Sequence, residues 1–413
     1  MRVLLVTQYF FPETGATSNR LLSLAKGLQA AGHEVAVVAE KPNHPEGVIR
    51  SDYRDGFFTE RCYEGVPVIY TWVYTRPQKD FKTRLLFYLS FMLTAILGSR
   101  RAQGPFDVVL ASSPPLFVGV AGWVAAWLKN ARFVFDVRDL WPDVAVAMGA
   151  LDNPALIRAA RFLERFLYKQ ADGVTAVTDS FCQHIEALTR SEKPLARVMN
   201  GTVPEVFQQE EAGRRLRSEL DLDDAFVVAY AGNHGEAQGL AHVLGAAAHL
   251  QKGASGVHFL MVGSGPVKRE LIEKAQQQGL TNVQFRARVP LKEAGAHMAA
   301  ADALLVPLAR HEIYQQFIPS KLFDSMAAGR PVLLSVSGEA RTILEEAGGG
   351  RYYPAEDGPA LAEQILWLRD HPEACREMGR RGQDYALRHC TREAQAEKLV
   401  RFLEDRVADD RSA

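Results

Sequence analysis

Residues 226–240 read FVVAYAGNHGEAQGL. An apolar run suited to a buried strand passes into a turn with three glycines, and a helix-forming stretch follows. The same order of strand, turn and helix recurs along the chain. Strand-like runs lie at Val3–Val6, Val35–Val38, Val108–Leu110, Phe133–Phe135 and Val174–Val177, and then at Phe226–Tyr230, Val257–Val262, Val283–Phe285, Ala303–Val306 and Pro331–Leu334. This alternation predicts an α/β protein with two doubly wound, Rossmann-like domains.

The turn-rich segment Met199–Phe207 separates the two series of strands, because it contains Asn200-Gly201 and Pro204. We therefore predict a first domain over 1–200 and a second over 201–390. Residues 391–413 are expected to form a helix that crosses back toward the first domain. The two domains should face each other across a cleft, with their binding loops at the carboxyl ends of the strands.

Composition places the chain among ordinary globular proteins. It has 413 residues, 47% hydrophobic and 23% charged, with a formal net charge of -1. That balance predicts no nucleic-acid partner. Four scattered cysteines favour free thiols in a reducing compartment. No run approaches the ~20 apolar residues of a membrane span, so a cytoplasmic location is expected.

Glycines in the first quoted stretch are candidates for binding phosphate. Gly232, Gly235 and Gly239 follow a strand, where a backbone without side chains can approach a phosphate closely and the next helix offers free N–H groups. A tight turn with no ligand is the alternative. Gly263, in the turn Val262–Pro266, could line the nucleoside or could belong to a plain strand–helix turn.

The stretch PSKLFDSMAAGRP at 319–331 supplies a charge. Lys321 falls in the first turn of a predicted helix, where it opposes the helix dipole unless an anion lies nearby. Asp324 follows on about the same face and could accept both hydroxyls of a ribose. A simple Lys–Asp pair on a helix is the alternative. Together the two stretches indicate a nucleotide-sugar donor, with Lys321 neutralising its diphosphate.

Two segments of the first half carry further candidates. Gly15, between the first strand and first helix, could allow close approach to a sugar, and Arg20 could meet an anionic acceptor. Arg138 and Asp139 follow a predicted central strand in Phe135–Asp143, where charges are costly to bury unless they bind something. Asp139 or Asp143 could hold acceptor hydroxyls or assist proton transfer, and Arg138 and Asp139 could orient the acceptor. A salt-bridge network that holds the loop is the alternative.

Residues 79–101 combine many apolar side chains with basic residues at both ends. The segment is too short to span a membrane, but it could lie at an anionic membrane surface. A helix with both faces packed is the alternative. A metal is not expected, because Asp221-Leu222-Asp223 lies in a polar turn ahead of a strand and no histidine–carboxylate cluster is evident.

These motifs together resemble the family-4 retaining glycosyltransferases of the two-domain GT-B architecture. More narrowly, the chain is similar to bacterial fucosamine-type transferases of O-antigen and capsule assembly. The resemblance covers nearly the whole chain and rests on these segments: Gln8–Arg20, Arg138–Asp143, Asn200-Gly201, Ala231–Leu240, Val262–Pro266 and Pro319–Pro331.

The resemblance implies a UDP-sugar donor bound mainly by the second domain, and metal-independent transfer with retention at the anomeric carbon. The family's Glu-x7-Glu motif is matched by Gln316 and Asp324, so both acids are replaced. The family's usual Arg/Lys pair around the donor diphosphate is absent from Gly232–Leu240, which leaves Lys321 as its substitute. Val203 replaces the acid of the family's hinge motif, and Arg138 stands where the family has a histidine.

We expect an enzyme that moves a hexose or N-acetylated deoxyhexose from UDP to a polyprenyl-diphosphate-linked saccharide at the cytoplasmic face of the inner membrane. Gly15 would line the reacting centre, and domain closure would exclude water. Non-hydrolysing nucleotide-sugar epimerases and non-catalytic nucleotide-sugar-binding proteins remain alternatives. A dinucleotide-dependent oxidoreductase would need a G-x-G-x-x-G after the first strand, where the chain has Gln8–Pro12.

Overall fold

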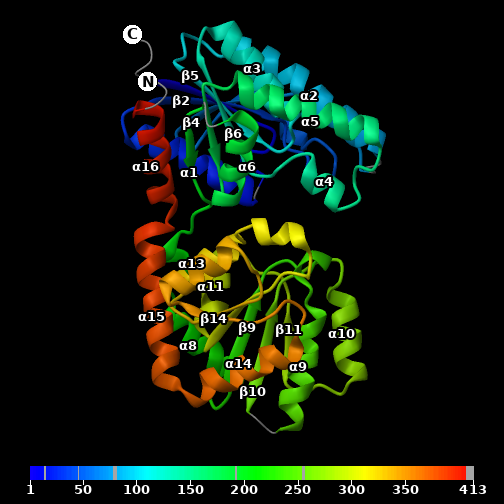
Figure 1. Cartoon of the computed structure of the whole chain (residues 1–413), viewed down its shortest axis with the longest axis vertical. Coiled ribbons are helices and arrows are strands. Elements are labelled where there is room, and N and C mark those ends of the chain that lie inside the picture. Colours follow the sequence, from blue (N-terminus) through cyan, green and yellow to red (C-terminus); the bar gives the residue numbers. More distant parts are fainter. Residues whose placement is uncertain (14, 45, 78–80, 191–192, 254–255, 406–413) are drawn as a thin grey trace. The chain divides into compact units, whose positions relative to one another are not determined.

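The structure is a computed structural model of the chain, and it describes residues 1–405 apart from 14, 45, 78–80, 191–192 and 254–255. The chain divides into two compact units. Unit 1 contains Met1–Asn200 together with the segment that begins at Arg392, and unit 2 contains Gly201–Thr391. Each unit has one sheet with helices on both faces (Figure 1).

The sheet of unit 1 has the order β3-β4-β2-β1-β5-β6-β7-β8, in which β3 is antiparallel to β4 and all other neighbours are parallel. Its strands are β1 Arg2–Thr7, β2 Glu34–Glu40, β3 Phe58–Tyr63, β4 Val66–Thr71, β5 Val108–Ser113, β6 Arg132–Val137, β7 Gly173–Ala176 and β8 Leu195–Arg197. Its helices are α1 Ala16–Ala30, η1 Ser51–Tyr53, α2 Phe81–Arg101, α3 Phe117–Lys129, α4 Asp143–Ala147, α5 Pro154–Gln170, α6 Asp179–Thr189 and α16 Arg392–Leu403.

Buried side chains on both faces of the central strands explain the continuous apolar runs of the sequence. In β1, Val3 and Leu5 belong to the core beneath α1 and α16, so Leu4 and Val6 point to the opposite face. The elements α2 and α3 pack on that opposite face, and α1 contacts α16 directly (Figure 1). The predicted strands of this unit are therefore confirmed, whereas β3, β4 and β8 were missed.

The sheet of unit 2 is parallel, with the order β11-β10-β9-β12-β13-β14. Its strands are β9 Phe226–Ala231, β10 Val257–Val262, β11 Val283–Arg286, β12 Ala303–Val306, β13 Val332–Leu334 and β14 Gly350–Tyr352. Its helices are α7 Pro204–Phe207, α8 Glu210–Glu219, η2 Glu236–Gln238, α9 Ala241–Lys252, α10 Lys268–Gln277, α11 Leu291–Ala299, η3 Glu312–Gln316, α12 Ser320–Ala327, α13 Glu339–Ala347, α14 Gly358–Asp370 and α15 Pro372–His389.

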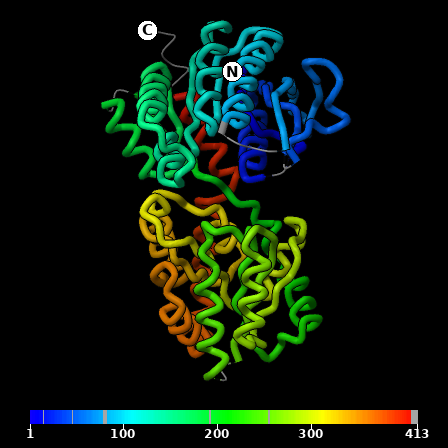
Figure 2. Tube along the Cα trace, turned by 90° about the vertical axis from the view of Figure 1, so that its right-hand side faces the viewer, coloured from blue at the N-terminus to red at the C-terminus, as the bar shows by residue number. Residues whose placement is uncertain are grey.

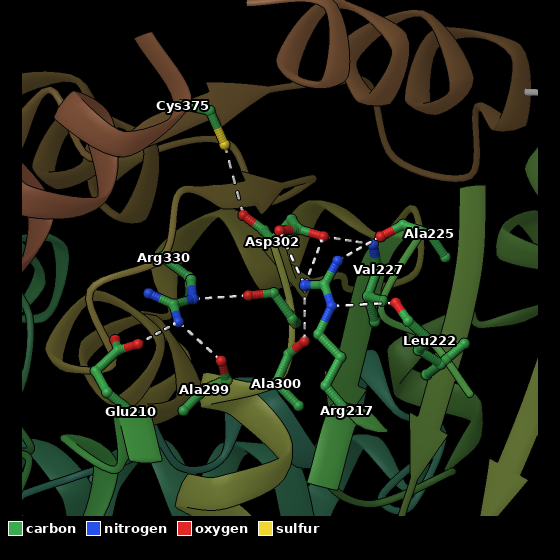
Figure 3. A network of polar contacts seen from close by, with 11 residues as sticks. Glu210, Arg217, Leu222, Ala225, Val227, Ala299, Ala300, Asp302, Arg330 and Cys375 are labelled. Atoms are coloured by element: carbon green, nitrogen blue, oxygen red, sulfur yellow. Dashed lines mark hydrogen bonds and ion pairs between the residues drawn. The ribbon is translucent and has the colours of Figure 1, made fainter. Parts of the chain in front are cut away.

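Charged side chains at the amino-terminal edge of this second sheet serve the fold (Figure 3). The carboxylate of Asp302, just before β12, accepts from the guanidinium of Arg217 at 3.1 Å and from the backbone N–H of Val227 at 2.7 Å. Arg330 donates to the carbonyl of Ala299 at 2.8 Å and pairs with Glu210 at 2.8 Å. These bonds join helices α8 and α11 to the start of the sheet, so this edge is closed by internal contacts.

The strand order also decides where ligands can enter each unit. In a doubly wound sheet, ligands bind at the carboxyl ends of the strands where the strand order reverses. That point lies between β1 and β5 in unit 1, and between β9 and β12 in unit 2. The loops that follow β9 and β12 contain the quoted glycines and the approach to Lys321, and the loop after β1 leads to Gly15.

Candidate functional site

The loops after β9 and β12 touch each other at the switch point of unit 2. The backbone N–H of Ala309 donates to the carbonyl of Ala237 at 2.9 Å. Gly239 has a positive φ of 57°, and a Cβ there would lie 3.0 Å from Cα of Ala309. Gly239 therefore serves the packing of the two loops, since a larger residue would push them apart.

Lys321 connects the start of α12 to the end of β9. Its ammonium donates to the hydroxyl of Tyr230 at 2.6 Å and lies 4.4 Å from the centre of that ring. The Tyr230 hydroxyl in turn donates to the carbonyl of Asn233 at 2.5 Å. Burial lowers the pKa of Lys321 to about 8, although Asp324 raises it in part. A partly buried cation therefore lies beside the glycine turn.

Gly232 and Gly263 lie against this lysine and against each other. Both have positive φ angles, 154° and 142°. A Cβ at Gly232 would overlap Cε of Lys321, and a Cβ at Gly263 would overlap the carbonyl oxygen of Gly232. The structure therefore brings Gly232, Gly263 and Lys321 into one cluster, with Asp324 one helical turn further along α12.

The backbone amides of the glycine turn differ from expectation. The N–H of Gly232 donates to the carbonyl of Val262 at 2.9 Å, and the N–H of Gly235 donates to the side chain of Gln238 at 3.1 Å. Because both amides are already used inside the protein, these two glycines offer close approach rather than free donors. The charge that neutralises a diphosphate must come from side chains.

Two further residues beside the turn were missed in the sequence. His234 is fully buried, with its ring 5.5 Å from that of Tyr230, and neither ring nitrogen has a hydrogen-bond partner among the described residues. Burial, helped by the nearby charge of Lys268, lowers the pKa of His234 to about 4. Lys268, in the first turn of α10, donates to the carbonyl of Gly263 at 2.7 Å. Lys268 is the second residue after Gly265-Pro266, and this position was the available signal.

Gln316 ends the short helix η3, in the loop between β12 and α12. It is half-buried, and the next residue, Phe317, donates its N–H to the carbonyl of Tyr314 at 3.2 Å. The structure thus places Gln316 in the loop that leads to Lys321 and Asp324. The role of Gln316 stays a prediction.

In unit 1, Arg138 directly follows β6 and connects the end of β5 with the start of α1. Its guanidinium donates to the carbonyl of Ser113 at 2.8 Å and to the hydroxyl of Thr17 at 2.6 Å. Thr17 lies in the first turn of α1, which Gly15 precedes. Gly15 is exposed, and a Cβ there would meet no atom within 4 Å. The predicted residues Gly15 and Arg138 are therefore neighbours at the switch point of unit 1.

Arg20 does not face a ligand. Its guanidinium is buried and forms an ion pair with Asp136 at 2.9 Å, and it donates to the carbonyl of Met199 at 2.6 Å. Ser112 and Thr175 donate to the same carboxylate at 2.7 and 2.8 Å. Burial alone would raise the pKa of Asp136, but Arg20, Arg138 and these hydroxyls hold it below the usual range. The network satisfies Arg20 internally, so an anionic acceptor must be met elsewhere.

Asp139 and Tyr9 complete the polar surroundings of Arg138. Burial raises the pKa of Asp139 to about 6, and Arg138 opposes the shift. Burial also raises the pKa of Tyr9, Glu40 and Tyr88 raise it further, and Arg138 lowers it. Tyr88 belongs to α2, so that helix borders this site. Asp143 lies outside it. This residue begins α4, and its carboxylate pairs with Arg161 at 3.1 Å.

Within the described ranges, no three His, Cys, Asp or Glu side chains are grouped as a metal site would require. None of the helices formed by these residues combines the length and the apolar character that a membrane span needs.

Comparison with known families matches both halves of the chain. The model described as glycosyl transferase 4-like domain matches residues 15–201, and the model described as glycosyl transferases group 1 matches residues 225–371.

Three relatives extend the likeness. WcaI of Escherichia coli (strain K12), which carries the name of a colanic acid biosynthesis glycosyl transferase, is 27% identical over 83% of this chain and 85% of its own length. The glycosyltransferase WbjE of Pseudomonas aeruginosa is 26% identical, with 69% and 72% covered. A GDP-mannose-dependent alpha-mannosyltransferase of Mycobacterium tuberculosis (strain CDC 1551 / Oshkosh) is 24% identical, with 86% and 84% covered.

Solved structures share the fold. Sucrose-phosphate synthase from Thermosynechococcus elongatus aligns with a TM-score of 0.74 at 19% identity, covering 98% of both chains. HepE of Anabaena in complex with UDP has the same TM-score of 0.74 at 16% identity, covering 98% of this chain and 100% of its own. The chain therefore belongs to the family-4 type of GT-B glycosyltransferases, with a glycosyl transferase 4-like domain followed by a glycosyl transferases group 1 domain.

Proposed function

We propose that this glycosyltransferase moves a hexose or N-acetylated deoxyhexose from a UDP-sugar to a polyprenyl-diphosphate-linked saccharide, in the biosynthesis of a surface polysaccharide. The reaction retains the anomeric configuration and needs no metal. The enzyme works in the cytoplasm, peripherally on the inner membrane through residues 79–101. The relatives named for colanic acid biosynthesis and for glycosyl transfer support the pathway class.

The cluster of Lys321 and the two glycines carries this proposal. The ammonium of Lys321 is held 2.6 Å from the hydroxyl of Tyr230, and Gly232 leaves no side chain between that ammonium and the turn. A diphosphate beside Lys321 would replace the lost solvation of a partly buried cation with two negative charges. Asp324, on the same helix face, would accept the ribose hydroxyls. Gly263 and Gly235 would border the nucleotide.

The chemistry follows from charge that develops on the leaving group. As the bond between the anomeric carbon and the phosphate oxygen breaks, negative charge grows on the UDP diphosphate, and Lys321 stabilises it. The acceptor hydroxyl attacks the same face of the sugar and gives its proton to the departing phosphate oxygen. Such a front-face attack needs no protein nucleophile. Arg138 and Asp139 would orient the acceptor, and Gln316 would hold a sugar hydroxyl.

A GDP-sugar donor is the second candidate. It is favoured by the GDP-mannose-dependent alpha-mannosyltransferase, which covers most of this chain in the alignment. Both donors present the same diphosphate and ribose, so Lys321 and Asp324 would serve either. The base alone distinguishes them.

Thermal shift with UDP-, GDP- and dTDP-sugars tests the donor. A ligand at 100 times its Kd adds about 2.7 kcal/mol to the free energy of unfolding. We expect stabilisation by UDP-sugars, its loss in Lys321→Met, and its retention in the control Lys274→Met, which changes an exposed lysine of α10. Stabilisation by GDP-sugars alone would select the second candidate, and none by any donor would end the proposal.

Transfer to a polyprenyl-diphosphate-linked saccharide is then followed by mass spectrometry, and the anomeric configuration of the product by NMR. We expect one added sugar, with the donor's configuration, in the presence of EDTA. An inverted product would contradict retention. Activity that EDTA abolishes and Mg²⁺ restores would contradict metal independence. Conversion of the donor sugar without any acceptor would point to an epimerase.

A further inference from the structure

Helices α2, α3 and α5 form one layer on unit 1. The element α3 contacts both α2 and α5. The rings of Trp123 in α3 and Phe166 in α5 meet edge to face with centroids 5.0 Å apart. Figures 1 and 2 show the three helices side by side in two perpendicular views. Their outward side is called the three-helix face below.

The part of α2 in this face is apolar and exposed. Phe87, Phe91 and Ala95 are buried, so α2 does pack on unit 1 along one side. Leu86, Leu93 and Leu97 follow one another at helical spacing on the other side and are 51%, 58% and 48% exposed. The alternative that both faces of this helix are packed is therefore wrong for its described residues. Residues 79 and 80 lie outside the described ranges.

Aromatic side chains continue the face on the neighbouring helices. Trp127 of α3 is 76% exposed, and Phe162 of α5 is 74% exposed. Six of the twelve most exposed large apolar side chains in the described part of the chain lie on these three helices. Single exposed apolar residues are common, but such a concentration marks an interaction surface.

The charged residues of the three helices are almost all basic. They carry nine basic residues and one acid, although the whole chain has a net charge of -1. The acid, Glu164, is buried and bonded to Tyr168 and His184. Six of the basic residues are exposed and have no ion pair within the described ranges: Lys82, Arg84, Arg100, Arg158, Arg165 and Lys169. The remaining basic residues are Arg101, Lys129 and Arg161.

We propose that the three-helix face binds the surface of an anionic lipid bilayer, with Trp127 and Phe162 inserted among the headgroups and the basic residues of α2 and α5 against lipid phosphates. This deepens the proposed function, on which it rests for a lipid-linked acceptor. It extends the membrane contact from α2 to α3 and α5. An interface with large apolar residues ringed by unpaired lysines and arginines is suited to such a bilayer.

The position of the face agrees with an acceptor anchored in lipid. The element α2 begins at the carboxyl edge of the sheet of unit 1, where Gly15, Tyr9 and Arg138 lie. Tyr88 of α2 acts electrostatically on Tyr9. A saccharide on a lipid held at the start of α2 would therefore be close to the candidate acceptor residues of the same unit. A protein partner would not by itself explain this placement.

Co-sedimentation with vesicles tests the aromatic residues. We expect the full-length protein to pellet with vesicles of phosphatidylglycerol and phosphatidylcholine and to stay in solution with phosphatidylcholine alone. The double variant Trp127→Ser, Phe162→Ser should bind the anionic vesicles at least tenfold more weakly. The control Leu291→Ser, Leu387→Ser changes two exposed leucines of unit 2 and should bind like the unchanged protein.

A second variant tests the charges and does not alter the core. Replacing Arg158, Arg165 and Lys169 with serine should weaken binding about fivefold per residue, since each basic side chain near an anionic surface contributes about 1 kcal/mol. Serines at Lys274, Lys292 and Arg388, exposed in unit 2, provide the control. Binding should also fall as salt rises, because the screening length shrinks to about 3 Å at 1 M.

Binding unchanged in both face variants, or equal binding to neutral vesicles, would overturn the proposal. So would a dimer of the unchanged protein that the Trp127→Ser, Phe162→Ser change dissociates, since a second copy would then cover the face. Thermal shift with UDP-sugars is run on each variant. Vesicle binding without donor binding would sink the proposed function alone, and donor binding without vesicle binding would sink the three-helix face alone.

Discussion

Lys321 lies where both burial and a helix N-terminus oppose a positive charge. The sequence revealed the second of these effects, because the lysine follows Pro319 at a helix start. The burial of Lys321 is visible only in the structure, in which the hydroxyl of Tyr230, from another element, accepts from the ammonium at 2.6 Å. Neither His234 nor Lys268 was predicted, since burial of a loop histidine depends on contacts that local sequence does not encode.

The pKa of Lys321 makes donor affinity depend on pH. With a pKa of about 8 in the free protein, the ammonium loses its proton as pH rises above 8. Bound diphosphate would raise that pKa, so affinity should fall up to tenfold per pH unit above about 8. Isothermal titration with UDP at several pH values measures this. In Lys321→Met, affinity should be about 10- to 100-fold lower and flat with pH. A flat profile in the unchanged protein would contradict the role of Lys321.

Asp139 should produce the acid limb of the transfer rate. Its pKa is raised to about 6, so the carboxylate is ionised above that pH and protonated below it. If the ionised form accepts from an acceptor hydroxyl, kcat/KM for the acceptor should decrease as pH falls below 6. Asp139→Asn should remove this limb and lower the rate about 100-fold. Asp143→Asn, which changes the ion-pair partner of Arg161, should keep the limb. A limb that persists in Asp139→Asn would exclude the assignment.

At the scale of elements, the strand–turn–helix units were predictable because strands buried on both faces need continuous apolar runs. The central strands of both sheets followed from this rule. The strand β3 did not, since its residues are exposed or half-buried and most carry polar side chains. The helix α5 begins at Pro154 because the side chain of Asn153 accepts from the N–H groups of Ala155 and Leu156 in its first turn.

The turns after β9 and β10 depend on glycine for a reason that can be tested. Gly263 has φ 142°, and a Cβ there would overlap the carbonyl oxygen of Gly232. We expect Gly263→Ala to lower the free energy of unfolding by about 1–3 kcal/mol and to weaken UDP binding, because the two turns must separate. Denaturation in urea and isothermal titration measure the two effects.

Gly15 provides the contrast. A Cβ there would meet nothing within 4 Å, so Gly15→Ala should leave stability unchanged to within about 0.5 kcal/mol. If the room beside Gly15 is used by the reacting sugar, the rate of transfer should still fall. A stable Gly15→Ala variant with full activity would remove Gly15 from the candidate site. A Gly263→Ala variant as stable as the unchanged protein would contradict the geometry of the turns.

At the scale of the whole molecule, the chain leaves unit 1 after Asn200 and returns to it at Arg392. The helix α16 is part of the core of unit 1. Leu399 and Leu403 are buried there beside residues of α1, and Gly27 of α1 approaches Ala396 so closely that a Cβ on it would overlap the alanine. The fold of unit 1 therefore depends on residues from both ends of the sequence.

Removing α16 should destabilise unit 1. A chain that ends at Thr391 would uncover Leu399, Val400, Phe402 and Leu403, each contributing about 1.5–3 kcal/mol when buried. That loss is comparable to the ~5–15 kcal/mol stability of a domain, so we expect unit 1 to unfold or aggregate. Protection from hydrogen exchange in β1 and β2 measures this. A chain that ends at Asp405 should remain protected, and full protection without α16 would disprove its role in the core.

The sequence by itself determined the α/β class, the alternation of elements and the position of the turns, because apolar periodicity and glycine act over a few residues. It also placed Lys321 and Asp324 on one helix face. Only the tertiary structure decided that Tyr230 holds Lys321, that Arg20 is used internally by Asp136, and that three helices share one exposed, basic face. Those facts depend on which distant segments pack together, and that is set by burial over the whole fold.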